Sequence, residues 1–217
     1  MRVFHLIILI LISYLVKGQG SLELGLMPSL NFNKKLPKDW AINFKAEGRQ
    51  ALQDEKSYLQ TDISLLTSRK VGFSSTLALG YLLRVPNGKN LRNRLIQQYI
   101  VVNRLSALKL SHRFGTDQTF GGHEAAVYRF RYRIAAELPL NGNSTDPHEF
   151  FLKLSNEYVN SLEDSAYDLE IRGLGFLGYV LNPGAKLEFG LDYRIGSFLH
   201  QATRQRTWLA VNLYQSF

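Results

Sequence analysis

The chain has 217 residues, no cysteine, and 26 Lys and Arg residues against 18 Asp and Glu, a net charge of +8. The lack of cysteine excludes a disulfide framework, a lipid-anchored cysteine and a cysteine-ligated metal. The basic balance suits nucleic acid, an anionic membrane surface or acidic ligands. Signs of export at the N-terminus argue against nucleic acid.

Residues 1–18 have the pattern of a secretory signal peptide. Arg2 precedes an apolar run over 3–16, and Gly18 follows. The run is shorter than the roughly 20 apolar residues of a membrane-spanning helix, and small residues after it are typical of a cleaved signal. We therefore predict cleavage after Gly18 and one mature domain over 19–217. The alternative is an uncleaved N-terminal anchor.

In the mature chain the recurring pattern is an alternation with period two, which is typical of strands with two different faces. It is clearest over 126–138, where Tyr128 and Phe130 share one face and Arg129 and Arg131 the other. Turn-forming residues separate similar segments. In chain order, strands are expected over 21–33, 40–49, 59–65, 73–84, 92–104, 107–114, 126–138, 150–158, 167–180, 186–194 and 206–217.

This pattern predicts an all-β fold, a single antiparallel transmembrane β-barrel of 10–12 strands. A soluble sandwich or lipocalin-like barrel is the alternative, with the apolar face inside. Four features favour the membrane: export, strands longer than the 5–6 residues of a typical soluble strand, aromatic residues expected near strand ends, and a polar face whose charges of both signs can pair across a narrow lumen. These aromatic residues are Trp40, Tyr81, Tyr158 and Tyr193.

The number of strands is constrained by a general rule. Bacterial single-chain barrels normally have an even number of strands, so ten or twelve are expected rather than the eleven segments counted. Segment 21–33 would then either lie outside the barrel or hide a second strand. Pro28 within it favours some irregularity.

The charged face of the strands is the candidate site. In a membrane barrel it would line the lumen, where charges of both signs can pair. The expected lumen-facing ladder is Lys45, Glu47, Arg49, Arg129, Arg131, Arg133, Glu137, Lys153, Glu157, Glu170, Arg172, Lys186, Glu188, Asp192 and Arg194. We expect a largely filled lumen, because side chains can fill narrow barrels. The alternative is a porin-like anion channel, since rings of Arg or Lys select anions.

Residues with catalytic or metal-binding chemistry are sparse. His112, His123, His148 and His200 are too far apart in sequence to form a recognisable metal motif, and no cofactor is expected. A lipid hydrolase acting at the rim is a second alternative, for which Ser111-His112 and the Gly121–Glu124 segment are the only local hints. A nucleophile needs a base oriented by a third group, so no catalytic residue is assigned and the protein is not expected to be an enzyme.

The last residues give a resemblance. Leu209, Val211 and Leu213 alternate before Phe217, which resembles the last strand of bacterial outer-membrane barrels, although Gln215 departs from that pattern. The resemblance implies that Phe217 is part of the signal read by the barrel-assembly machinery.

Five segments further resemble an uncharacterised family of small outer-membrane β-barrels, a domain of unknown function with the number 2490: 94–102, 128–140, 154–158, 173–183 and the last strand. The family brings no established activity. It implies localisation in the bacterial outer membrane. The basic charge of an exported chain separately favours membrane lipids and lipopolysaccharide, with their anionic head groups, as partners. The sequence leaves the oligomeric state open.

Overall fold

The computed structural model describes residues 22–53, 58–121, 125–200 and 202–217. Over these residues the chain forms eleven long strands. They are β1 (Leu22–Leu36), β2 (Trp40–Ala51), β3 (Tyr58–Lys70), β4 (Ser75–Pro86), β5 (Arg92–Leu105), β6 (Leu108–Phe120), β7 (Val127–Pro139), β8 (Phe150–Glu163), β9 (Ala166–Asn182), β10 (Ala185–Gly196) and β11 (Arg204–Ser216). The described part of the chain contains no helix long and apolar enough to cross a membrane.

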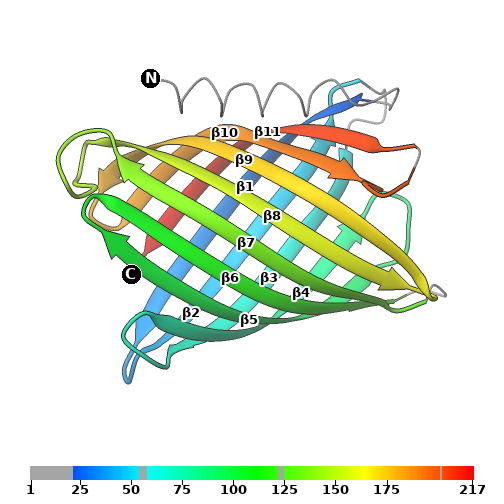
Figure 1. The fold of residues 1–217 in the computed structure, drawn as a ribbon, viewed down its shortest axis with the longest axis horizontal. Coiled ribbons are helices and arrows are strands. Elements are labelled where there is room, and N and C mark those ends of the chain that lie inside the picture. The colour runs from blue at the N-terminus through cyan, green and yellow to red at the C-terminus, as the bar shows by residue number, and fades with distance from the viewer. Residues whose placement is uncertain (1–21, 54–57, 122–124, 201) are drawn as a thin grey trace.

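The strands form one closed barrel in which each strand pairs with its neighbours in sequence (Figure 1). Ten of the pairings are antiparallel, and the barrel closes through a parallel pairing of β1 with β11. An odd number of strands requires this parallel closure, because the first and last strands then run in the same direction. The argument from even strand numbers, which excluded eleven, is therefore wrong for this chain.

Each predicted strand segment corresponds to one observed strand, although several are longer than predicted. Segment 21–33 forms a single strand, β1, and not two. Pro28 pairs with Val211 of β11 on one side. On the other side the ladder with β2 skips from Leu26 to Ser29, which fits a residue that cannot donate a backbone hydrogen bond. The irregularity expected at Pro28 is therefore local.

The two faces of the strands are chemically opposite. Large apolar side chains are exposed on all eleven strands, among them Leu79, which is 62% exposed, and Phe189, which is 58% exposed. The buried set includes Asp117 and Glu157. A soluble barrel has the reverse arrangement, with its apolar residues inside.

The strand ends carry exposed aromatic residues. Trp40, Tyr58 and Phe150 are the first residues of β2, β3 and β8, and all three are exposed. Of the aromatic residues predicted near strand ends, Trp40 and Tyr193 lie there. Tyr81 and Tyr158 lie well inside β4 and β8, because these strands extend further than predicted.

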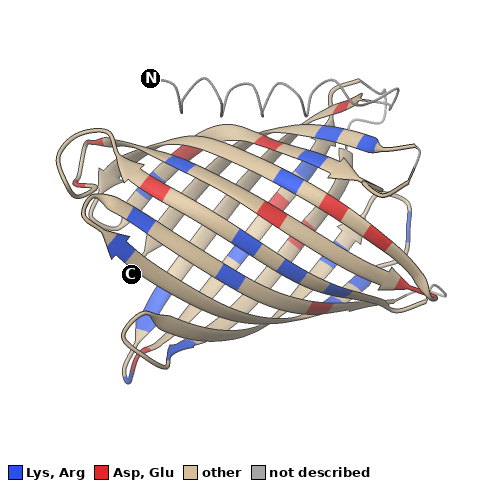
Figure 2. Cartoon of the chain, viewed as in Figure 1, with Lys and Arg blue, Asp and Glu red and all other residues tan. Residues whose placement is uncertain are grey.

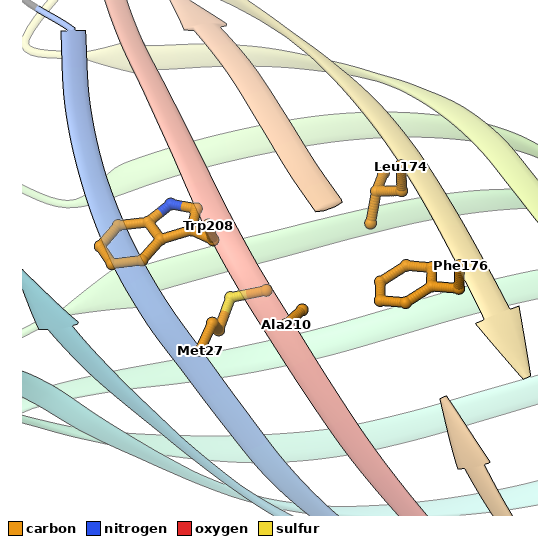
Figure 3. Close-up of a cluster of buried hydrophobic side chains, with 5 residues drawn as sticks. All are labelled: Met27, Leu174, Phe176, Trp208 and Ala210. Carbon is orange, nitrogen blue, oxygen red and sulfur yellow. The ribbon is translucent and has the colours of Figure 1, made fainter. Parts of the chain in front are cut away.

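Part of the interior is apolar (Figure 3). Met27, Leu174, Phe176, Trp208 and Ala210 form a buried cluster contributed by β1, β9 and β11. Gly25 makes room for the Trp208 ring of this cluster, since a Cβ added at Gly25 would lie 2.3 Å from that ring. Side chains therefore fill this part of the barrel.

Candidate functional site

The barrel encloses a cavity of about 430 Å³ that is lined mainly by charged side chains. Twelve members of the predicted ladder line it: Lys45, Glu47, Arg49, Arg129, Arg131, Arg133, Lys153, Glu170, Arg172, Glu188, Asp192 and Arg194. The alternation of the strands accounts for this placement, because residues two apart on a strand point to the same face.

The other predicted residues are placed as follows. Glu157 is fully buried beneath arginines that line the cavity. Glu137 and Lys186 line a second, smaller pocket together with Arg104 and Lys109. Phe217 is 70% exposed directly after β11, and its backbone N–H donates to the carbonyl of Asn33 in β1.

Glu157 on β8 is the centre of the largest ion-pair cluster. Its Oε1 accepts a hydrogen bond from Arg113 at 2.8 Å. Its Oε2 accepts from Arg131 at 3.0 Å, Arg133 at 3.2 Å and Arg172 at 3.4 Å. The four arginines come from β6, β7 and β9, so one carboxylate holds three strands to β8.

Asp117 on β6 is the centre of a second cluster and is 1% exposed. Its Oδ1 lies 2.8 Å from Nη1 of Arg129 and 3.4 Å from Nε of Arg94. Its Oδ2 lies 3.5 Å from Nη1 of Arg131. Arg131 therefore joins this cluster to that of Glu157.

Asp117 and Arg113 were missing from the predicted ladder. Both lie on β6, whose predicted segment stopped at residue 114 whereas the strand continues to Phe120. The signal was present in the alternation from Lys109 through Arg113 to Asp117, all on the interior face. It was obscured because Thr116 and Gln118, which face outward, are also polar.

On β8 to β11 the charges pair more evenly. Arg194 donates to both oxygens of Asp192, at 2.8 and 2.7 Å, and both side chains are buried. Lys153 reaches across β9 to Glu188 on β10 at 2.8 Å. Arg172 also binds Glu170 on its own strand. These acids and bases thus neutralise each other nearly one to one.

The two sides of the barrel therefore differ in charge. Strands β4 to β7 carry nine Lys or Arg residues and two acidic residues. Strands β8 to β11 carry six of each. Figure 2 shows the basic residues gathered along β6 and β7 and the acidic residues recurring along β8 and β9.

The candidate hydrolase residues are not brought together. Ser111 faces the interior with Arg113, whereas His112 points to the opposite face and bonds the hydroxyl of Tyr132 at 2.9 Å. His123 lies outside the described residues. His148 and His200 are exposed in connections, and the described residues hold no group of three or more His, Asp or Glu able to bind a metal.

The comparisons with known proteins agree with the uncharacterised barrel family. Residues 24–207, which include β2 to β10 entire, match the family described as "Protein of unknown function (DUF2490)". No curated protein and no solved structure was found to be similar to the chain. With a match over most of its length and an all-β closed barrel, the chain belongs to the DUF2490 family.

Proposed function

We propose that the protein is an integral barrel of the bacterial outer membrane with a structural or binding role and a lumen closed by its own side chains. The observation that carries this proposal is the reversal of the two faces. Apolar side chains are exposed on every strand, whereas Glu157 and Asp117 are buried inside. In water these exposed apolar side chains would be unfavourable, whereas in lipid their exposure is favourable.

The dimensions support a membrane setting. The strands are 12 to 17 residues long, and a tilted membrane strand needs about 9–11. The exposed aromatic residues at strand ends, such as Trp40, Tyr58 and Phe150, suit the level of the lipid head groups. In this proposal a signal peptide directs export, the barrel-assembly machinery inserts the chain, and membrane lipids and lipopolysaccharide surround it.

Cross-barrel contacts support a closed lumen. Arg113 reaches Glu157 across β7, and Arg206 approaches Glu170 across β10 at 3.6 Å. Lys186 on β10 lies 4.0 Å from Glu137 on β7, and strands β8 and β9 lie between these two strands in the sheet. Together with the cluster around Trp208, these contacts between strands that are not neighbours support the proposal that side chains fill the interior.

Two experiments test this proposal. Membrane fractions from expressing cells would release the protein only with detergent, and a mature chain that stays soluble and monomeric without detergent would contradict the membrane setting. The purified barrel in a planar lipid bilayer would give no steady current. A steady anion-selective current would instead favour the second candidate function, a narrow anion channel, which the excess of arginine on β4 to β7 supports.

A non-catalytic role is part of the proposal, because Ser111 and His112 lie on opposite faces of β6 and cannot act together. Purified protein incubated with phospholipid vesicles would release no fatty acid. Turnover by the wild-type barrel that disappears in the His112→Ala variant would contradict this part and would make the rim a site of lipid chemistry.

A further inference from the structure

One side of the cavity holds more cations than its carboxylates neutralise. We define the arginine wall as the six arginines of β4 to β7 that line the cavity: Arg84, Arg94, Arg113, Arg129, Arg131 and Arg133. The carboxylates that touch it are Asp62, Asp117 and Glu157. Two of the three are further shared with cations outside the wall, because Asp62 lies near Arg49 and Glu157 near Arg172.

The exposure of these groups decides what a solute in the cavity would meet. The carboxylate side chains are covered: Glu157 is 0% exposed and Asp117 1%. Arg113 and Arg133 of the wall are more exposed, at 27% and 26%, whereas Arg94 is buried like the carboxylates. Of the three carboxylates that touch the wall, Asp117 and Glu157 do not line the cavity and Asp62 does, so a solute entering from this side meets mainly guanidinium groups.

The excess cations are also incompletely bonded. Within the described residues, Glu157 is the one side chain at hydrogen-bond distance from Arg113, and likewise from Arg133. The Nε atoms of Arg131 and Arg133 are buried and meet no hydrogen-bond acceptor in the part of the chain that the structure describes. The neighbouring arginines repel one another because they carry like charges. A second anion beside Glu157 would neutralise part of this positive charge and accept hydrogen bonds from the guanidinium groups.

We propose that the arginine wall binds a small oxyanion of the phosphate class that carries more than one negative charge. Guanidinium groups present paired N–H donors that match phosphate oxygens. The cavity volume of about 430 Å³ falls within the range of about 300–1,000 Å³ that is typical of small-molecule sites. The proposal deepens the binding role proposed above and rests on the same lumen.

The same chemistry has two sources, a free phosphate compound or a phosphorylated lipid head group. The test therefore uses two probes on the purified, detergent-solubilised chain: inorganic pyrophosphate, and phosphatidic acid mixed into micelles of a neutral detergent. Binding is measured by isothermal titration calorimetry. Saturable binding of at least one probe is expected, and the probe that binds identifies the source. If neither probe binds saturably, the proposal is overturned.

Three variants locate the site. Arg113→Gln and Arg133→Gln are each expected to weaken binding by about tenfold or more, since each removes a charged hydrogen-bond donor. Lys153→Gln is the matched control, because Lys153 also lines the cavity and is 28% exposed but lies outside the arginine wall and is paired with Glu188. It is expected to change affinity by less than about twofold. Equal weakening by all three variants would show nonspecific charge attraction and overturn the site.

Separate controls test whether each variant folds and inserts. Closed barrels resist unfolding by detergent in the cold, so a folded variant migrates faster in gel electrophoresis before heating than after it. A variant without that mobility is replaced by Arg113→Lys or Arg133→Lys, which keep the charge but lose the paired donors and are expected to bind less tightly than the wild type. Detergent-dependent extraction is scored independently, so a failed membrane setting is distinguishable from a failed anion site.

Discussion

Strands β4 to β7 and strands β8 to β11 differ in how the numbers of their acidic and basic residues balance. On β8 to β11 the acids and bases are equal in number, and pairs such as Asp192 with Arg194 are complete in themselves. On β4 to β7 the bases outnumber the acids, and Glu157 of β8 is shared by four arginines. The same alternation thus yields balanced charge on one side of the barrel and an excess of cations on the other.

The two sides also differ in how their pairs are encoded. Asp192 and Arg194, like Glu170 and Arg172, are two residues apart on one strand and so share a face whatever the register. On the other side the partners come from different strands. Glu157 meets Arg133 because the register of β7 with β8 places them opposite each other. These two pairs of the paired side are therefore local in origin, whereas the pair of Lys153 with Glu188 and the clusters of the arginine-rich side depend on register.

The largest effect is expected at Glu157. Glu157→Gln would leave the arginines around it without their shared anion, at an expected loss of about 4–5 kcal/mol in the free energy of unfolding, because unpaired buried charge is costly. Urea unfolding in lipid vesicles, followed by tryptophan fluorescence, would measure it. A loss below about 1 kcal/mol would mean that water or ions already neutralise the cluster.

A somewhat smaller loss is expected on the paired side. Arg194→Gln leaves Asp192 buried without its one bidentate partner and should cost about 3 kcal/mol. The same urea titration applies. If the double variant Arg194→Gln, Asp192→Asn were no more stable than the single variant, the pair would not be the unit of stabilisation that the geometry indicates.

Next in size is a packing effect. A Cβ added at Gly178 would lie 2.1 Å from the ring of Phe151, which is fully buried. Gly178→Ala should therefore destabilise by about 1–3 kcal/mol through overpacking. Gly173→Ala is the control on the same strand, since nothing lies within 4 Å of its added Cβ. Equal losses for the two variants would show that backbone effects and not Phe151 set the cost.

The smallest effect is expected at Arg133. Arg133→Gln removes one of four cations from Glu157, so the lost attraction is offset by relief of repulsion, and stability should change by less than about 1 kcal/mol. The wild type should also gain more stability than the variant when salt is raised from low concentration, because salt screens repulsion. A loss as large as that of Arg194→Gln would remove the distinction between the two sides.

The sequence predicted the strands well because alternation is a local property. Each of the eleven segments was recognised, and errors arose where the outer face is polar, as at Thr116, whose hydroxyl donates to Gln97 on the neighbouring strand β5 at 2.7 Å. The strand number was predicted from the rule that such barrels have an even number of strands. Whether the number is even depends on whether β1 pairs with β11 in antiparallel or parallel orientation. The alternation along either strand is the same in both cases, so the sequence does not distinguish them.

The interior site could be predicted as a set of residues but not as a set of partners. Most members of the charged ladder follow from counting in twos along each strand. Which arginines share Glu157, and that Asp117 anchors a second cluster, follow only from the register of β6 with β7 and of β7 with β8. Register is fixed by contacts distant in sequence, which a single sequence does not display.

We expect the apolar face of the strands to contact lipid and the charged face to enclose the lumen. The chain has no cysteine, so single cysteines at Leu79 on the outer face of β4 and at Ser155 in the cavity can each carry a nitroxide label. In reconstituted vesicles, electron paramagnetic resonance should show the Leu79 label accessible to oxygen and shielded from a water-soluble nickel reagent, and the Ser155 label shielded from oxygen. A Leu79 label that is open to the nickel reagent would contradict the claim.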